Sequence, residues 1–206
     1  MDQALMSTSE TRSIVTSVVL VISGASGAAY GVRLLEVLCD IGAEVNLVVT
    51  ESGRLTLQHE CTTTPEELAA RFDVRLEANN DVAAKSASGS ARIEHVVICP
   101  ASGTTIGKIA SGIGDNLATR SAIVALKERR NLILVPREAP FATVHLEQMT
   151  RLSTHGAVIL PASPGFYNHP ETIDDLIDFI VARILDQMNL EHTLGRRWTG
   201  KEIGES

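Results

Sequence analysis

The stretch Val18-Val19-Leu20-Val21-Ile22-Ser23-Gly24-Ala25-Ser26-Gly27-Ala28 decides the fold class. Its first five residues are apolar and mostly β-branched, which is typical of a strand that is buried on both faces. The small residues that follow form a tight turn, and apolar residues then recur at helical spacing over residues 28–40. A buried strand, a tight turn and an amphipathic helix in this order predict the first unit of a parallel α/β sheet.

The alternation of strands and helices continues along the chain. Residues 73–94 break the pattern and are predicted to form a loop. The whole pattern predicts a doubly wound, mostly parallel sheet with helices on both faces, flavodoxin-like or Rossmann-like, in one domain over residues 14–190. Residues 1–13 are expected to be a disordered extension and residues 191–206 a tail. The further strands are predicted at 45–49, 95–99, 132–135 and 157–160, and the further helices at 54–60, 64–72, after Ser102, 116–130, 143–153 and from Thr172 onward.

The composition excludes several classes of function. The chain has 206 residues, with 18 Lys and Arg against 25 Asp and Glu, a net charge of −7, and 3% aromatic residues. This balance gives no general attraction to nucleic acid or to anionic membranes, and aromatic platforms for base stacking are scarce. Residues 13–32 carry no charge, but they are too rich in Gly, Ser and Thr to be a membrane span. We therefore expect neither a nucleic acid nor a membrane as partner.

The cysteines and histidines point to a reducing compartment and to no metal. Cys39, Cys61 and Cys99 show no Cys-x-x-Cys spacing, which favours the cytoplasm over a disulfide framework. The six histidines form neither a His-x-x-x-His nor a His-Glu-x-x-His pattern, so no metal site is predicted. No Gly-x-Ser-x-Gly elbow occurs with a plausible histidine and acid, which disfavours a serine hydrolase.

Two turns beyond predicted strands are suited to an anion. Ligands of a doubly wound sheet bind beyond the carboxyl ends of its strands, where Gly24 to Ala28 and Ser102 to Thr105 supply small residues and hydroxyls. Each turn would present backbone N–H groups at a helix N-terminus, which suits phosphate. An ordinary tight turn and an ordinary helix cap are the alternatives. The first turn lacks the three glycines and the acid of a dinucleotide fingerprint, so a mononucleotide fits better than NAD.

Charged and aromatic side chains supply further candidates. Arg137 and Glu138 lie just beyond a buried strand, where a surface ion pair is the alternative. Lys127 ends a helix and could turn inward. Arg183 lies among apolar residues of the last helix, where a snorkelling arginine is the alternative. The aromatic candidates for covering a ligand, with core filling as the alternative, are Phe166, Tyr167 and Trp198.

Seven motifs resemble those of one family, the UbiX flavin prenyltransferases. The resemblance covers roughly residues 17–198. It is most specific in V-P-R-E-A-P followed by P-G-F-Y, whereas G-A-S-G-A is shared with other FMN-binding flavoproteins. The motifs are G-A-S-G-A-x-Y-G at 24–31, C-P-A-S at 99–102, D-N-L at 115–117, L-K-E-R-R at 126–130, V-P-R-E-A-P at 135–140, H-L-x-x-M at 145–149 and P-G-F-Y at 164–167.

The resemblance implies a reaction and its participants. In this family the dimethylallyl group of dimethylallyl phosphate is joined to N5 and C6 of reduced FMN, without a metal. The prenylated FMN then passes to a UbiD-type decarboxylase. The resemblance also implies a homo-oligomer, a dodecamer.

The same resemblance implies roles for individual residues. Ser26 and Glu138 would handle protons, Lys127 would serve catalysis, and Trp198 would face the allylic group. Cations and hydroxyls on the leaving phosphate would replace a metal ion, because they stabilise the charge that develops as the allylic phosphate ionises. FMN would be held by Gly24, Ala25, Ser26, Thr50, Ser102, Gly103, Thr104, Thr105 and Arg137, and the prenyl phosphate by Lys127, Arg137, Tyr167 and Arg183, with Arg120 and Glu60.

Two other functions compete with prenyl transfer. An FMN-dependent oxidative decarboxylase of a cysteine-containing substrate resembles P-A-S-A-N-T where this chain has Pro100 to Thr105, and the missing Asn counts against it. A non-catalytic FMN carrier would need neither Lys127 nor Glu138. Prenyl transfer is therefore the favoured hypothesis.

Overall fold

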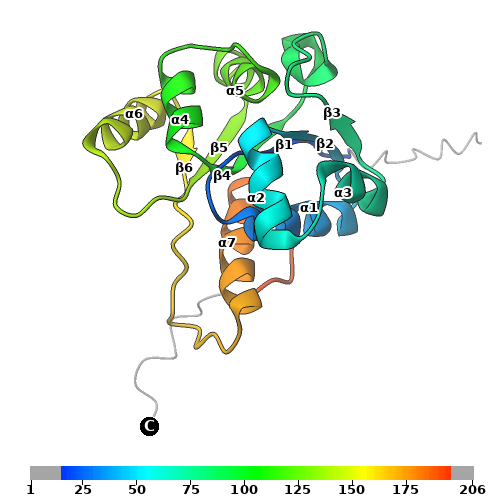
Figure 1. Cartoon of the computed structure of the whole chain (residues 1–206), viewed down its shortest axis with the longest axis vertical. Helices are drawn as coiled ribbons and strands as arrows, with labels where there is room; N and C mark the ends of the chain where they lie inside the picture. The colour runs from blue at the N-terminus through cyan, green and yellow to red at the C-terminus, as the bar shows by residue number, and fades with distance from the viewer. Residues whose placement is uncertain (1–14, 196–206) are drawn as a thin grey trace, which may run out of the picture.

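The computed structural model describes residues 15–195. The predicted extension at 1–13 and Trp198 lie outside the described residues. Six strands form one parallel sheet in the order β3-β2-β1-β4-β5-β6 (Figure 1). The strands are β1 (Ser17–Ile22), β2 (Glu44–Val49), β3 (Arg75–Glu77), β4 (His95–Ala101), β5 (Asn131–Pro136) and β6 (Val158–Ile159).

Helices cover both faces of the sheet, so the predicted doubly wound architecture is confirmed. Local sequence signals explain where several of them begin. Thr64 and Thr172 each form a capping box with an acid three residues later, and Asn116 accepts a hydrogen bond from Thr119 N at 3.0 Å. The helices are α1 (Ala28–Asp40), α2 (Glu51–Cys61), α3 (Pro65–Phe72), α4 (Gly103–Ala110), α5 (Leu117–Lys127), α6 (Thr143–Thr154) and α7 (Ile173–Gln187).

The prediction of a continuous loop over residues 73–94 was wrong in part. Strand β3 pairs with β2 at the sheet edge, from Asn46 opposite Arg75 to Val48 opposite Glu77. Two short 3₁₀ turns, Lys85–Ala87 and Gly89–Ala91, follow it. Three residues are too few to show the alternation that marks a strand, so β3 forms through its pairing partner and not through a local pattern.

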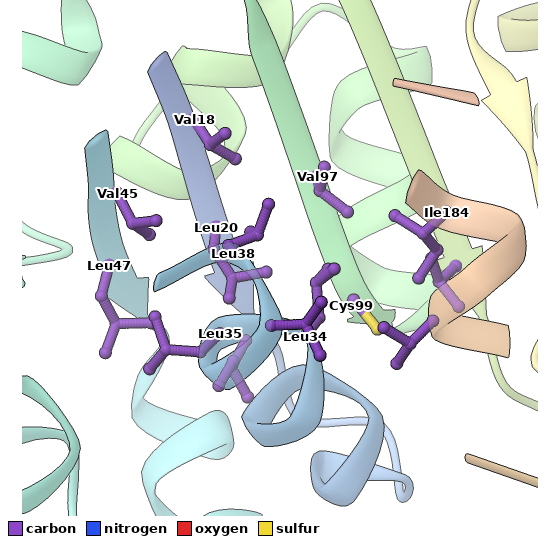
Figure 2. Close-up of a cluster of buried hydrophobic side chains, with 14 of the residues drawn as sticks. Val18, Leu20, Leu34, Leu35, Leu38, Val45, Leu47, Val97, Cys99 and Ile184 are labelled. Carbon is purple, nitrogen blue, oxygen red and sulfur yellow. The ribbon is translucent and has the colours of Figure 1, made fainter. Parts of the chain in front are cut away.

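The core consists of two layers, one on each face of the sheet. Alternate residues of β1 point to opposite faces: Val18, Leu20 and Ile22 pack against α1, α2, α3 and α7, whereas Val19 and Val21 face α4, α5 and α6. Figure 2 shows strand side chains of the first layer meeting leucines of α1 and Ile184 of α7. Burying such a leucine contributes about 1.5–3 kcal/mol. None of the helices among residues 15–195 is long and apolar enough to cross a membrane.

The strand order reverses direction between β1 and β4. From β1 the chain goes outward to β2 and β3, and from β4 it goes to β5 and β6 on the other side. A crevice opens at such a reversal, beyond the carboxyl ends of the two strands. The two anion-suited turns, Gly24 to Ala28 and Ser102 to Thr105, follow β1 and β4 and therefore lie at this crevice.

Candidate active site

Ser23 joins the two turns at the crevice. Its hydroxyl donates a hydrogen bond to Pro100 O at 2.8 Å and accepts one from Ser102 N, also at 2.8 Å. The side chain is fully buried. Ser23 therefore fixes the end of β1 against the end of β4. Gly24 was the first residue predicted for the site, and Ser23 was not predicted. The position of a serine directly after the apolar run Val18 to Ile22 was a signal that could have identified it.

The N-terminus of α1 is occupied by a carboxylate of the chain itself. Glu60, near the end of α2, accepts hydrogen bonds from Gly27 N at 2.8 Å and Ala28 N at 2.9 Å. Gly27 takes the left-handed conformation, with φ 107°, that lets these two N–H groups face one acceptor. The predicted anion site thus exists, and in this structure Glu60 fills it.

The surroundings of Glu60 favour its charged form. Partial burial acts to raise its pKa, but hydrogen bonds from the Gly27 backbone, the Ser26 hydroxyl and the Ala28 backbone, together with the charge of Arg137, outweigh burial and lower the pKa. Glu60 is therefore an anion that holds Ser26 and the first turn of α1.

Arg137 and Glu138 follow directly after β5. Arg137 extends toward the turn at Ser26, whereas Glu138 is exposed to solvent. Arg137 Nε donates to Ser26 O at 2.9 Å, which brings the cation beside the Glu60 carboxylate. Glu138 is exposed, and its carboxylate accepts a hydrogen bond from Ala139 N at 3.2 Å. The structure does not show the alternative of a surface ion pair between Arg137 and Glu138, because Arg137 bonds to the turn after β1.

The second turn leaves donors available to a ligand. Ser102 caps α4 by accepting from Thr105 N at 3.3 Å, and the two hydroxyls lie 3.0 Å apart. Within residues 15–195 no acceptor meets the backbone N–H of Gly103 or Thr104. This helix N-terminus can therefore still receive an anionic or carbonyl oxygen, whereas Glu60 occupies that of α1.

Thr50 borders the crevice on the side of β2. It caps α2 by accepting a hydrogen bond from Gly53 N at 3.0 Å, and its own N–H donates to Ile22 O at 3.1 Å. The residues gathered at the switch point are therefore Gly24, Ala25, Ser26, Thr50, Glu60, Ser102, Gly103, Thr104, Thr105 and Arg137.

The four remaining cationic and aromatic candidates divide between two separate cavities. Tyr167 and Arg183 line a cavity of about 760 Å³ beside α7, where the Tyr167 ring meets Phe179 edge to face at 5.7 Å. Arg120 and Lys127 line another, of about 490 Å³, between α5 and the 3₁₀ turns. Lys127 is exposed and paired with Glu128, so within one copy of the chain it does not turn inward.

No metal site is visible in the part of the chain that the structure describes. Residues 15–195 hold no cluster of three or more His, Cys, Asp or Glu side chains that could bind an ion. The cations Arg137, Lys127, Arg120 and Arg183 are the groups with which this chain could neutralise a phosphate.

Comparison with known proteins identifies the family. The Flavoprotein family model matches residues 6–185. The chain is 42% identical over 190 residues to the flavin prenyltransferase UbiX of Methanothermobacter thermautotrophicus, a match that covers 92% of this chain and 99% of the relative. The chain belongs to the UbiX family. The family that the sequence motifs indicated is therefore confirmed.

Solved structures of UbiX proteins share the fold closely. A crystal structure described as AnUbiX (PadA1) in complex with FMN and dimethylallyl pyrophosphate superposes with a TM-score of 0.88 at 37% identity, covering 91% of this chain and all of that one. A structure described as a dodecameric FMN-dependent UbiX-like decarboxylase from Escherichia coli O157:H7 gives a TM-score of 0.85 at 42% identity, covering 89% and 99%.

Proposed function

We propose that this UbiX-family chain is a flavin prenyltransferase that joins the dimethylallyl group of dimethylallyl phosphate to N5 and C6 of reduced FMN. The observation that carries the proposal is the crevice at the β1–β4 switch point, which combines free donors on α4 with Arg137 and a carboxylate-bound Ser26. The AnUbiX complex with FMN and dimethylallyl pyrophosphate supports it, because 91% of this chain aligns with that protein.

The N–H groups of Gly103 and Thr104, together with Thr50 and Arg137, bind FMN at the switch point. Their donors match the oxygens of a mononucleotide, and the first turn lacks the Gly-x-Gly-x-x-Gly spacing of a dinucleotide site. FMN is a substrate here, and no metal is required.

Prenyl transfer breaks the bond between the allylic carbon and the phosphate oxygen and forms bonds from the prenyl unit to the flavin. Lys127, Arg137, Tyr167 and Arg183, with Arg120, stabilise the departing phosphate by charge and hydrogen bonds. Glu138 and Ser26 move the protons lost from the flavin, and Glu60 holds Ser26 in place. Trp198 lies outside the described residues, and the family resemblance alone assigns it to the allylic group.

The two separate cavities favour a site assembled from several copies of the chain. Lys127 and Arg120 line a different cavity from Tyr167 and Arg183, so a neighbouring subunit would have to bring them to one phosphate. The UbiX-like protein of Escherichia coli O157:H7 is dodecameric. We therefore infer a homo-oligomer, a dodecamer, in which subunits share each site.

The product and the compartment follow from the same proposal. Prenylated FMN would serve a UbiD-type decarboxylase as its cofactor. The three cysteines, all of them free thiols, fit a reducing cytoplasm.

Two measurements test the proposal. Purified protein should bind FMN in preference to FAD or NAD in a fluorescence titration. It should also change the flavin absorption spectrum when reduced FMN and dimethylallyl phosphate are supplied, with EDTA present. Preferential binding of FAD or NAD would contradict the flavin assignment. Release of CO₂ from a cysteine-containing substrate would favour the decarboxylase instead, and FMN binding without any turnover would favour the carrier.

A further inference from the structure

A three-residue hydrogen-bonded relay lies in the cavity beside α7. Asp186 divides its two carboxylate oxygens between neighbours: Oδ2 accepts from Arg183 Nη1 at 2.8 Å, and Oδ1 lies 3.2 Å from His192 Nε2. All three residues line the cavity that also contains Tyr167. A carboxylate held from both sides has a fixed orientation, and so has the guanidinium that it holds.

His192 anchors this relay from a buried position. Its side chain is 4% exposed, against 22% for Asp186 and 53% for Arg183. Because a carboxylate accepts hydrogen bonds, His192 Nε2 carries the proton in this contact. His192 belongs to the segment after α7, whose neighbouring residues Leu190 and Leu194 pack against the core. The histidine is therefore fixed by burial, while the arginine at the other end is accessible to a ligand.

We propose that Asp186 and His192 are positioning residues that orient Arg183 for the phosphate of the prenyl donor. The inference rests on the proposed function, since it deepens the role of the cavity that contains Tyr167 and Arg183. Asp186 uses one Nη1 hydrogen of Arg183, and no other described side chain is seen to bond to that guanidinium, so the remaining donors are available to a phosphate.

The other acids of the cavity have different attachments. Asp178 binds Arg33 at 2.7 Å, and Asp175 accepts hydrogen bonds from the backbone of Glu171 and Thr172 at the start of α7. Among the acids that line this cavity, which also include Glu171, Asp186 is the one described as bonded to Arg183. An isolated exposed pair of this kind would contribute little. Here the hydrogen bond from buried His192 strengthens the effect of the pair, because it keeps the Asp186 carboxylate from rotating away from Arg183.

Steady-state kinetics on the FMN-loaded, full-length protein test the proposal. His192→Ala should raise the KM for dimethylallyl phosphate about 3- to 10-fold, the usual effect of one lost buried hydrogen bond, while kcat stays within about 2-fold. His192→Gln keeps an N–H donor and should restore most of the affinity. Asp186→Asn removes one of the two acceptor oxygens that Arg183 and His192 contact, and should also raise KM. His169→Asn changes another histidine of the same cavity, at a left-handed position that Asn tolerates, and should leave KM unchanged.

A double-mutant cycle separates positioning from a general structural effect. If His192 acts through Arg183, His192→Ala should have no further effect on KM in an Arg183→Leu background. Equal effects in both backgrounds, or a wild-type KM in both His192→Ala and Asp186→Asn, would overturn the proposal. Calorimetric titration with inorganic phosphate, compared for wild type, His192→Ala and Arg183→Leu, gives a readout that needs no turnover. Weaker phosphate binding in both variants supports the relay even if prenyl transfer fails, and unchanged binding in His192→Ala contradicts it.

Discussion

At the scale of single residues, the structure distinguishes two carboxylates that the sequence placed in one site. Glu60 is bound by Gly27, Ala28 and Ser26, and its pKa is lowered, so it remains an anion. Glu138 is exposed beside Arg137 at the end of β5. A fixed anion suits the holding of Ser26, and an accessible carboxylate suits the transfer of a proton.

Glu138→Gln should therefore slow prenyl transfer by about 10²- to 10⁴-fold, the usual contribution of general acid–base catalysis. The amide keeps the shape of the side chain but cannot titrate, so the Kd for FMN should be unchanged. Single-turnover flavin spectra at saturating substrate measure the rate. Glu147→Gln, an exposed residue of α6, is the matched control. A wild-type rate for Glu138→Gln would rule out the acid–base role.

Glu60→Gln should change how stability depends on pH. The folded-state pKa of Glu60 lies below its usual value of 4.5, so the unfolded chain binds a proton more readily than the folded one. The stabilisation by the charged form is present above pH 4.5 and is lost as the pH falls through the folded-state pKa. Denaturant unfolding of wild type and Glu60→Gln at several pH values should show the difference in free energy of unfolding shrinking with acidification. Parallel profiles would contradict the assignment.

At the scale of elements, local signals were readable from the sequence and long-range contacts were not. The capping box at Thr64 and the turn at Gly24 to Ala28 depend on residues within a few positions, and the predicted helix at 64–72 and the predicted tight turn are both present. The contact of Glu60 with Gly27 spans 33 residues, and that of Ser23 with Pro100 spans 77. Only the fold creates such contacts. The position of the crevice could be predicted, because ligands of such sheets bind beyond the carboxyl ends of the strands. The family resemblance named Glu60 as a site residue, but it did not predict that Glu60 accepts hydrogen bonds from the N-terminus of α1.

The α3 cap offers a test of stability independent of the site. Thr64→Ala removes the hydroxyl that accepts from Glu67 N at 3.2 Å and should reduce the free energy of unfolding by about 1 kcal/mol. The rate of prenyl transfer should not change, because no residue of α3 is among those gathered at the switch point. Urea unfolding measures the first effect, with Thr150→Ala on α6 as a control for loss of an exposed threonine. An unchanged unfolding midpoint would mean that the cap contributes nothing.

At the scale of the whole molecule, one copy of the chain forms the crevice where we propose that FMN binds, but it places the cations proposed to bind phosphate in different cavities. Gly31 shows how closely the layers around the crevice pack: a Cβ at this position would lie 2.4 Å from Cys99 O, so α1 can approach β4 only with glycine there. Under the proposed function, the exposed cations of α5 and α7 would be brought together by assembly of several copies of the chain.

Complementation between inactive variants tests this assembly. Lys127→Leu and Arg183→Leu should each abolish most activity as pure oligomers. If one site takes these residues from different subunits, dissociating and reassembling an equal mixture should restore about a quarter of the sites, because random mixing gives one intact combination in four. Activity measured against total protein gives the fraction. No recovery in assemblies shown to be mixed by native mass spectrometry would contradict a shared site.

The mass of the flavin after reaction tests the central claim most directly. Purified wild-type protein is incubated anaerobically with reduced FMN, dimethylallyl phosphate and EDTA, and the extracted flavin is analysed by mass spectrometry. The account predicts FMN heavier by one prenyl unit, with one phosphate released for each flavin modified, and no such product from Lys127→Leu. Recovery of unmodified FMN from wild-type protein that has bound both substrates would contradict it.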